Sequence, residues 1–393
     1  MAGSVVVGTS RRGAWRTVAL SFGLTAALGP APPEAAERAA LSYQPKSPYQ
    51  SAVLADASTG EILFAEAEHL RWPPASMVKM MTALLALESV AAGKTRLDDQ
   101  VVVSAHAGEM GGSQVYLSAG ERFSLRDLLA AMMIHSANDA AVAVAEHTAG
   151  STEAFVARMN ERAKELGMEE TEFHSVHGLP PTRDQQPDLS SAHDLVLLAR
   201  EVTRFPEVMG WAKTREASFR NGAFTLRNPN KLLWRYPDAT GLKTGTFGAA
   251  GFNVTATASR DGLDLIAVVM GSANGNERFA SAAKLLDSGF HDYSLLMPVH
   301  AGDAVGPQIS IASGREGFMM GVAAADIRMR LSREEAARTK VEVRVPTQVA
   351  APLQKGQKLG EVVVTRGDAE IVAVDVVSPR DFAAISWWQS LIP

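Results

Sequence analysis

The sequence predicts an α/β fold of the α+β type, in which helices cover both faces of one antiparallel sheet and a small all-β sandwich domain follows. Strand-like runs at residues 51–65 and 252–271 enclose a stretch of helical runs, which favours a sheet with helices packed on it. Beyond about residue 298 the pattern changes to short alternating runs separated by turn residues. A chain of 393 residues is long enough for two domains with their own cores, and we place these at residues 41–295 and 296–377.

Composition limits the classes of function. The formal net charge is −5 and the chain has no basic footprint, so nucleic acid is not an expected partner. The absence of cysteine excludes disulfides, cysteine-ligated metal sites and thiol catalysis. The chemistry predicted below requires neither a cofactor nor a metal ion.

The first 40 residues have the pattern of an export signal. Arg11, Arg12 and Arg16 precede an apolar run at residues 17–28, which is too short to span a bilayer, and small residues and prolines follow. We therefore predict a signal peptide and a disordered start over residues 1–40. The exported protein would then lie in the periplasm or at the outer face of the cytoplasmic membrane. A plain disordered N-terminus is the alternative.

The first predicted elements are a hairpin and a buried helix. The apolar runs within residues 51–65 flank the turn residues Ser58-Thr59-Gly60. Pro73-Pro74 then stops the chain, and a helix begins at Ser76 and continues to about Val90. Its residues are apolar nearly all round, which is typical of a helix buried in a core.

Cap, stop and turn residues mark the later elements. The predicted helices are 124–133, 138–150, 151–167, 191–205 and 277–290. The strands 252–259 and 263–271 flank Arg260-Asp261-Gly262, a hairpin turn. In the second domain the predicted strands are 308–311, 326–331, 340–345, 361–365 and 370–377.

Ser76 and Lys79 can form a nucleophile and its base. Residues three apart share a helix face, so the lysine amine can reach the serine hydroxyl. That hydroxyl is a weak nucleophile until a base takes its proton, and a lysine can serve only when it is neutral part of the time. Burial, the positive end of the helix dipole and a second cation such as Lys243 would each lower the lysine pKa. Taken alone, the motif is equally consistent with a helix cap and a solvated lysine.

Ser136 and Asn138 fall at a break between two apolar helices. The Ser136 hydroxyl could relay a proton between Lys79, a leaving amine and Lys243. The Asn138 amide could hold a substrate carbonyl or orient Lys79. For this motif alone, an ordinary loop in which Asn138 or Asp139 caps the next helix is the alternative.

Lys243-Thr244-Gly245 precedes the predicted strand 252–259. A lysine and a hydroxyl there could bind an anionic group, and the glycine would let another backbone approach closely. An exposed strand edge can also pair with an extended peptide. By itself the triplet could be a plain turn, since Lys-Thr pairs also occur at residues 94–95 and 213–214.

The order of the three motifs is more specific than any one of them. Ser76, Ser136 and Lys243 fall, in turn, at a helix start, an interhelical loop and a strand edge, which are the elements that acyl transfer needs. We therefore predict a single acyl-transfer site with Ser76 as its nucleophile.

With these motifs the chain resembles the low-molecular-mass penicillin-binding proteins of the serine D-alanyl-D-alanine carboxypeptidase family. The similarity covers roughly residues 50–375. Besides the three motifs it includes residues 56–60, 74–82, 117–121, 127–129, 177–179, 230–233 and 250–253. The resemblance implies a β-lactamase/transpeptidase-like catalytic domain, a peptidoglycan stem peptide ending in D-Ala-D-Ala as substrate, and β-lactams as inhibitors that trap the serine.

The resemblance also implies a role for each matching residue. Ser76 attacks the terminal D-Ala-D-Ala bond and forms an acyl-enzyme, Lys79 takes its proton, and Ser136 helps to pass a proton to the departing D-alanine. Water then releases the shortened stem peptide.

The implied substrate-binding residues are Asn138, Lys243, Thr244, Gly245, Thr246 and Arg278. Asn138 and Lys243 orient the substrate and tune the pocket. Thr244, helped by Arg278, receives the substrate carboxylate. The backbone N–H groups of Ser76 and Thr246 form the oxyanion hole.

Two positions depart from the family pattern. The second motif has Ala137 where the family often has glycine, which narrows the loop without touching the side-chain roles. Thr246-Phe247 stand where the family usually has His or Tyr followed by Thr. The second departure concerns turnover and substrate preference more than the fold.

Three alternatives stay open for the function: an endopeptidase on D-alanyl cross-links, a class A-like β-lactamase, and a slow penicillin-binding scaffold protein. The all-β domain disfavours a β-lactamase. No clear deacylating glutamate motif lies between the second and third motifs, although Glu169, Glu170 and Glu172 stay candidates.

The last residues, 378–393, have the pattern of a short amphipathic helix. Phe382, Ile385, Trp388 and Ile392 recur at helical spacing, and the run is too short to span a bilayer. Paired tryptophans suit a membrane interface, so we predict a peripheral anchor to the membrane surface. The alternative is that the tail docks on the β domain.

Overall fold

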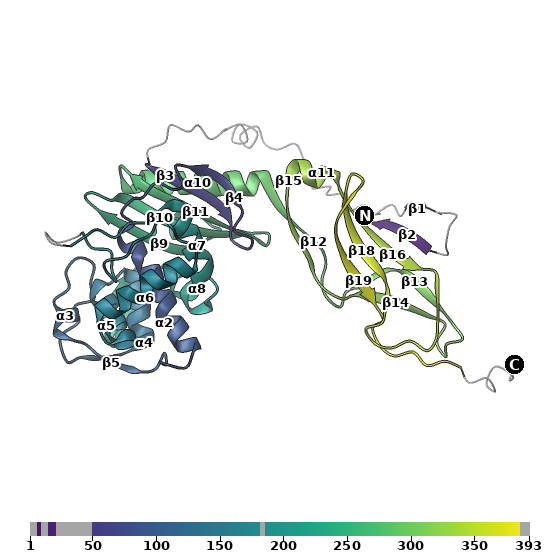
Figure 1. Cartoon of the computed structure of the whole chain (residues 1–393), viewed down its shortest axis with the longest axis horizontal. Helices are drawn as coiled ribbons and strands as arrows, with labels where there is room; N and C mark the ends of the chain where they lie inside the picture. The colour runs from purple at the N-terminus through teal and green to yellow at the C-terminus, as the bar shows by residue number, and fades with distance from the viewer. Residues whose placement is uncertain (1–5, 9–14, 21–48, 181–184, 386–393) are drawn as a thin grey trace. The chain divides into compact units, whose positions relative to one another are not determined.

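The computed structural model describes residues 6–8, 15–20, 49–180 and 185–385 (Figure 1). The chain forms two compact units. One lies within Ser42–His291, and the other comprises the residues from Asp292 onward together with the two N-terminal strands. The predicted α+β sheet domain followed by a β domain is confirmed.

The first unit is built on a five-stranded antiparallel sheet in the order β4-β3-β11-β10-β9. Its strands are β3 (Ser51–Asp56), β4 (Ile62–Glu66), β9 (Ala239–Phe247), β10 (Gly251–Arg260) and β11 (Leu263–Ser272). Both predicted hairpins are confirmed. The third motif, which is predicted to precede the strand 252–259, lies within a strand of its own, because β9 begins at Ala239. Its two glycines and its lysine are disfavoured in strands, and pairing with β10 outweighs this local preference.

The helices of this unit are η1 (Ala75–Val78), α2 (Lys79–Ala91), α3 (Ala105–Gly108), α4 (Leu125–Ala130), the π-helix η2 (Ala131–His135), α5 (Asn138–Ala149), α6 (Thr152–Glu165), α7 (Ala192–Val202), α8 (Pro206–Lys213), η3 (Arg220–Gly222), α9 (Leu232–Arg235) and α10 (Gly275–Asp292). Ser124, Ser151 and Ser191 cap α4, α6 and α7 with their side chains, as their sequence patterns predict. The helix α8 is not predicted from the sequence, because Pro206 can end one helix and, as here, occupy the first turn of the next.

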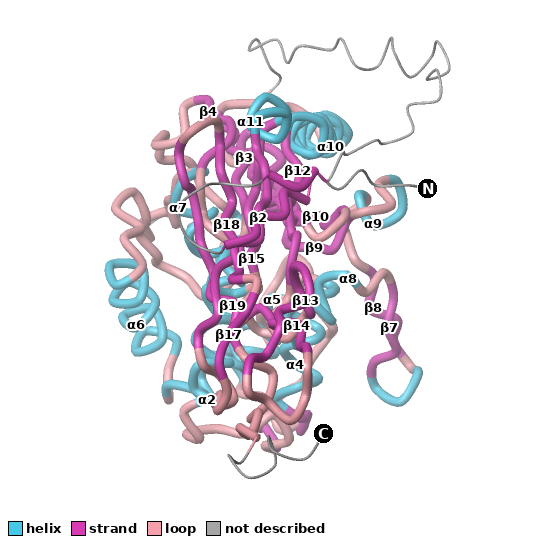
Figure 2. Tube along the Cα trace, turned by 90° about the vertical axis from the view of Figure 1, so that its right-hand side faces the viewer, coloured by secondary structure: helices cyan, strands magenta, loops and turns pink. Residues whose placement is uncertain are grey.

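Helices cover both faces of the sheet. Figure 1 shows α10 along one face and α7 along the other. The strands alternate accordingly: Leu54 and Leu265 contact the α10 side near Gly289, whereas Val53 belongs to the core on the opposite face. Two short strand pairs complete the unit, β5 (Gln100–Val102) with β6 (Arg122–Ser124) and β7 (Glu216–Phe219) with β8 (Phe224–Arg227). In Figure 2 the β7–β8 hairpin stands apart from the main sheet.

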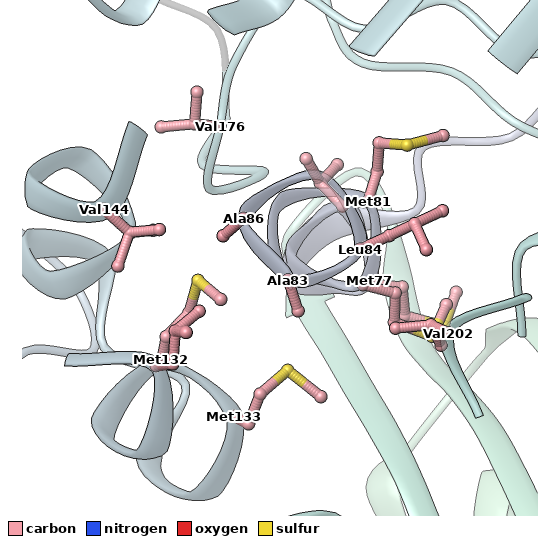
Figure 3. Close-up of a cluster of buried hydrophobic side chains, with 14 of the residues drawn as sticks. Met77, Met81, Ala83, Leu84, Ala86, Met132, Met133, Val144, Val176 and Val202 are labelled. Atoms are coloured by element: carbon pink, nitrogen blue, oxygen red, sulfur yellow. The ribbon is translucent and has the colours of Figure 1, made fainter. Parts of the chain in front are cut away.

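The helix α2 is buried in the centre of the larger core. Figure 3 shows apolar side chains on several sides of it, among them Met81, Leu84 and Ala86. Met132 and Val144 approach from neighbouring helices. Because other apolar side chains surround α2, its own residues are apolar on all sides, as predicted. The same packing fixes the position of the first turn of the helix, where Lys79 lies.

The second unit consists mainly of strands. They are β12 (Tyr293–Val299), β13 (Ala304–Ala312), β14 (Phe318–Ala323), β15 (Ile327–Ser332), β16 (Thr339–Pro346), β17 (Gln348–Ala350), β18 (Lys358–Arg366) and β19 (Ala369–Val377), with the helix α11 (Arg333–Arg338). The main sheet has the order β1-β2-β16-β18-β19-β14-β13-β17, and β12 pairs with β15. All five predicted strands are present, whereas β12, β14, β17 and α11 were missed.

Two short strands, β1 (Val6–Gly8) and β2 (Trp15–Leu20), fall within the predicted export segment. β2 pairs antiparallel with β16. The signal function of residues 1–40 stays a prediction.

The described part of the C-terminal tail is extended, so the predicted helix was wrong over residues 378–385. Phe382 pairs through its backbone with Leu353, and Ala384 bridges to Gly314. Phe382 is only 4% exposed, and its burial together with these bridges outweighs the helical spacing. Trp388 and Ile392 lie outside the described residues. Within the described chain we find no helix with the length and hydropathy of a membrane span.

Candidate active site

Ser76 lies in the short turn η1, directly before α2 and between two closely approaching backbones. A Cβ on Gly178 would lie 2.0 Å from the carbonyl oxygen of Ala75. A Cβ on Gly245 would lie 2.3 Å from the carbonyl oxygen of Pro74 and 3.1 Å from the backbone nitrogen of Ser76. Only glycine fits at either position, so these two residues bring other segments of the site against the nucleophile turn.

Lys79 is fully buried and reaches back to Ser76, as the spacing predicts. Its Nζ donates to Ser76 Oγ at 2.9 Å and to the carbonyl oxygen of His177 at 2.6 Å. Burial, and secondarily the charge of Lys243, hold the pKa of the Lys79 amine well below its usual value. A neutral amine can donate to the carbonyl and still accept the serine proton, whereas an ammonium group has no lone pair.

Ser136 and Lys243 form a second serine–lysine pair. Lys243 Nζ donates to Ser136 Oγ at 2.9 Å, and both side chains are buried. Ser136 ends the π-helix η2 in a left-handed conformation, with φ of 65°, and its backbone N–H bonds to Ala131. Burial, followed by the charge of Arg278, lowers the pKa of Lys243 to about 7. The structure therefore brings the three motifs together in one buried cluster.

Asn138 begins α5 and presents a buried amide. Its Nδ2 donates to the carbonyl oxygen of Gly111 at 2.7 Å. Its Oδ1 is buried and has no hydrogen-bond partner among the described residues. A buried acceptor without a partner is costly, so this oxygen suits an N–H donor of a bound ligand.

The third motif lies on β9, the edge strand of the sheet. Thr244 is buried, whereas Thr246 is exposed and Phe247 is half-buried. Arg278 Nη1 donates to the carbonyl oxygens of Gly245 at 3.2 Å and Asn253 at 3.0 Å, so this side chain braces β9 against β10. Burial lowers the pKa of Arg278 to about 10. Its predicted contact with a substrate carboxylate stays a prediction.

Sequence reasoning missed the residues that fix the carbonyl partner of Lys79. Ser175 Oγ donates to Asp188 Oδ2 at 2.6 Å and accepts from the backbone N–H of Gly178 at 2.8 Å. Asp188 also accepts from the backbone N–H of His174 at 2.7 Å. This buried network holds the turn that carries His177. In the sequence, the run His177-Gly178-Leu179 indicates the turn that this network holds. No sequence pattern indicates Asp188.

The glutamates considered for deacylation have other partners. Glu170 pairs with His69 at 3.2 Å, and Glu172 pairs with Arg71 at 3.1 Å. Glu169 is exposed. Within the described part of the chain, no hydrogen bond or ion pair joins these carboxylates to Ser76 or Lys79, which disfavours a class A-like arrangement.

Burying Lys243 costs stability, and its removal should reveal this cost. Its pKa falls from 10.5 to about 7 on burial. The unfolded chain therefore binds a proton between pH 10.5 and 7 that the folded protein does not, and the folded state loses stability as the pH falls through this range. We expect Lys243→Met to gain about 2 kcal/mol of unfolding free energy at pH 6, within a ceiling of about 5 kcal/mol, and to lose most of that gain at pH 10.

Thermal melts of both proteins at the two pH values measure this effect. The matched control is Lys213→Met, an exposed lysine that ends α8, which should change neither melt. A gain of equal size at both pH values, or a loss at pH 6, would contradict the expectation.

Two protein-family models match consecutive parts of this chain, and several known proteins are similar to it. Residues 39–274 match the Peptidase_S11 family model, described as D-alanyl-D-alanine carboxypeptidase, and residues 293–384 match the C-terminal domain of penicillin-binding protein 5. D-alanyl-D-alanine carboxypeptidase DacF of Bacillus subtilis is 35% identical over 336 residues, which cover 84% of this chain and 85% of the relative.

Two solved structures extend this similarity. Penicillin-binding protein 6B from Escherichia coli is 30% identical with a TM-score of 0.66, over 85% of this chain and 96% of that chain. Penicillin-binding protein D2 from Listeria monocytogenes, solved in its ampicillin-bound form, is 31% identical with a TM-score of 0.57, over 63% of this chain and 99% of that chain.

Proposed function

The chain belongs to the D-alanyl-D-alanine carboxypeptidase family of serine peptidases, and from this premise we propose that Ser76 is the nucleophile that removes the terminal D-alanine from peptidoglycan stem pentapeptides. The enzyme is a serine-type carboxypeptidase of the penicillin-binding class. The observation that carries the assignment of Ser76 is its 2.9 Å hydrogen bond to a fully buried Lys79 of lowered pKa.

Acylation begins when Ser76 Oγ attacks the carbonyl carbon between the two D-alanines. The hydroxyl proton passes to the neutral amine of Lys79, which the carbonyl oxygen of His177 holds in place at 2.6 Å. The bond from Oγ to carbon forms, the carbon–nitrogen bond breaks, and the departing amine of D-alanine takes up a proton. The pair Ser136–Lys243 supports a role in delivering that proton, because a hydroxyl can donate to the amine while it accepts from the lysine.

Deacylation releases the shortened peptide. A water molecule gives a proton to a neutral base of the site and attacks the ester carbon, after which the bond to Oγ breaks and Ser76 recovers its proton. Lys79 is the base we assign to this step, because Glu170 and Glu172 have other partners and Glu169 is exposed. The same serine would be trapped by β-lactams when this step is slow.

Substrate recognition would use the edge of β9 together with Asn138. The unpaired Oδ1 of Asn138 fits an amide N–H of the peptide. The hydroxyl of Thr244 and the cationic form of Lys243 fit its terminal carboxylate. The close approach of Gly245 to the nitrogen of Ser76, at 3.1 Å for an added Cβ, supports an oxyanion hole formed by the N–H groups of Ser76 and Thr246.

A panel of three substrates tests the proposed function. Wild-type enzyme is incubated with a stem pentapeptide, with a D-alanyl cross-linked muropeptide and with a labelled penicillin. We expect free D-alanine from the pentapeptide and a slowly released penicillin adduct. Cleavage of the cross-link in preference to the pentapeptide would indicate an endopeptidase. Fast penicillin hydrolysis would indicate a β-lactamase, and labelling without release of D-alanine would indicate a binding protein.

Export and membrane attachment are the second part of the proposal. The basic and apolar start of the chain supports export, and the tryptophans after Ile385 support peripheral attachment to the outer face of the cytoplasmic membrane. We expect a chain truncated after Ile385 to move from the membrane to the soluble fraction, while it retains carboxypeptidase activity. Truncation at this point keeps the buried Phe382. A truncated chain that still sediments with membranes would contradict the anchor.

A further inference from the structure

Three side chains from separate segments meet away from the serine–lysine cluster: His69, Glu170 and His193. One potential ligand atom from each lies within 4.8 Å of the other two. His69 Nδ1 and Glu170 Oε1 are 3.2 Å apart, and the two imidazole rings lie 4.9 Å apart between centroids. Ligands about 2.1 Å from a tetrahedral ion stand roughly 3.4 Å from each other. Small side-chain rotations would therefore bring all three into a ligand geometry.

The polar groups behind this cluster orient its members. His193 Nδ1 faces Asp194 Oδ1 at 3.4 Å, so Nε2 is the ring nitrogen that is left for an ion. Glu170 Oε2 accepts from Ser191 Oγ at 3.3 Å, which leaves Oε1 on the side of His69. Metal-binding histidines and carboxylates commonly have partners of this kind, which fix the ring and the ligand atom.

A second acidic side chain lies behind the cluster. Asp194 is fully buried, and its Oδ2 accepts from the backbone N–H of Glu170 at 2.9 Å and from Thr171 Oγ1 at 2.7 Å. Two carboxyl groups thus lie beside two imidazoles. The side chain of His69 is 58% exposed, so an ion can enter from solvent and water can complete its coordination.

We propose that His69, Glu170 and His193 form a binding site for a divalent transition-metal ion of the zinc type. A set of two imidazole nitrogens and one carboxylate oxygen favours zinc, because magnesium and calcium prefer oxygen ligands alone. The ion joins the segment that leads to the nucleophile turn, the segment that precedes the His177 turn, and the start of α7. The backbone bridges Trp72–Ser190 and Glu172–Leu189 already hold these segments together. The bound ion would stabilise the folded arrangement of these three segments around the active site. It takes no part in the acyl transfer.

The test uses full-length, tag-free protein freed of metal by a chelator. We expect saturable, equimolar binding of Zn²⁺ in calorimetry and a rise of about 5 °C in the thermal midpoint at ~100-fold excess over Kd. Co²⁺ should bind with visible absorption bands of a low-coordinate site, whereas Mg²⁺ and Ca²⁺ should leave the midpoint unchanged. The substitutions His69→Gln and His193→Gln should each abolish the Zn²⁺-dependent rise. Labelling by penicillin checks that both variants are folded.

A matched control is available in the same unit. His106 and Glu146 form a pair of 3.1 Å with exposed fractions of 57% and 22%, close to the 58% and 23% of His69 and Glu170, but no second histidine completes it into a described cluster. His106→Gln should keep the full response to Zn²⁺. Absence of saturable binding to wild type, binding that survives both histidine substitutions, or an equal loss in the His106 variant would overturn the proposal.

Discussion

Replacement of Ser76 by alanine should lower the release of D-alanine from a stem pentapeptide by on the order of 10⁴-fold or more, because the oxygen that forms the acyl-enzyme is removed. Labelled penicillin should no longer form an adduct. The change deletes one hydroxyl, so we expect the free energy of unfolding to stay within about 1 kcal/mol of wild type. D-alanine release, gel detection of the penicillin adduct and a thermal melt measure the three quantities.

The control for this variant is Ser118→Ala, which changes an exposed serine of the same unit and should retain activity and labelling. Penicillin labelling that persists in the Ser76 variant would show that another residue is the nucleophile. A labelling loss shared by the Ser118 variant would show that the assay reports folding and not chemistry.

Replacement of Lys79 by methionine should slow acylation by about 10³-fold, within the range that general bases contribute. Methionine keeps most of the buried volume but has no nitrogen to accept the serine proton. Lys79→Arg should be as slow, because a guanidinium group stays protonated at this pH. The measured quantity is the second-order rate of penicillin acylation across pH 5 to 9. We expect the wild-type rate to rise with pH as the Lys79 amine loses its proton, and the variants to lack this dependence.

Lys213→Met is the matched control, and it should keep the wild-type rate and pH profile. An arginine variant that acylates at the wild-type rate would exclude Lys79 as the base, because the charge alone would then suffice. A methionine variant that acylates slowly but keeps the rising pH profile would assign that profile to another group, of which Lys243 is the first candidate.

The parts of the fold that the sequence predicts well depend on local chemistry. The buried helix after Pro73-Pro74 has apolar residues on all sides, and the serine caps of α4, α6 and α7 act within a single turn. The pairing of Ser76 with Lys79 belongs to the same class, because three residues along a helix define one face. Such features need no knowledge of distant contacts.

The parts that sequence reasoning missed depend on contacts between distant segments. β9 is a strand because β10 pairs with it, and the tail is extended at Phe382 because Leu353 provides a backbone partner. The network of Ser175 and Asp188 acts on Lys79 through the carbonyl of His177 and through the charge of Asp188. None of these relations leaves a pattern within one short window of sequence.

The position of β9 at the edge of the sheet has a consequence for the evolution of resistance to β-lactams. On one side the strand is paired with β10, and no strand of the described chain pairs with its other side, where a ligand could bind through main-chain groups as an added strand. Side-chain mutations leave main-chain groups in place, and Gly245 admits no larger side chain. Variants that tolerate β-lactams would therefore arise by displacing the strand or slowing acylation, and both routes would also weaken binding or turnover of the natural peptide.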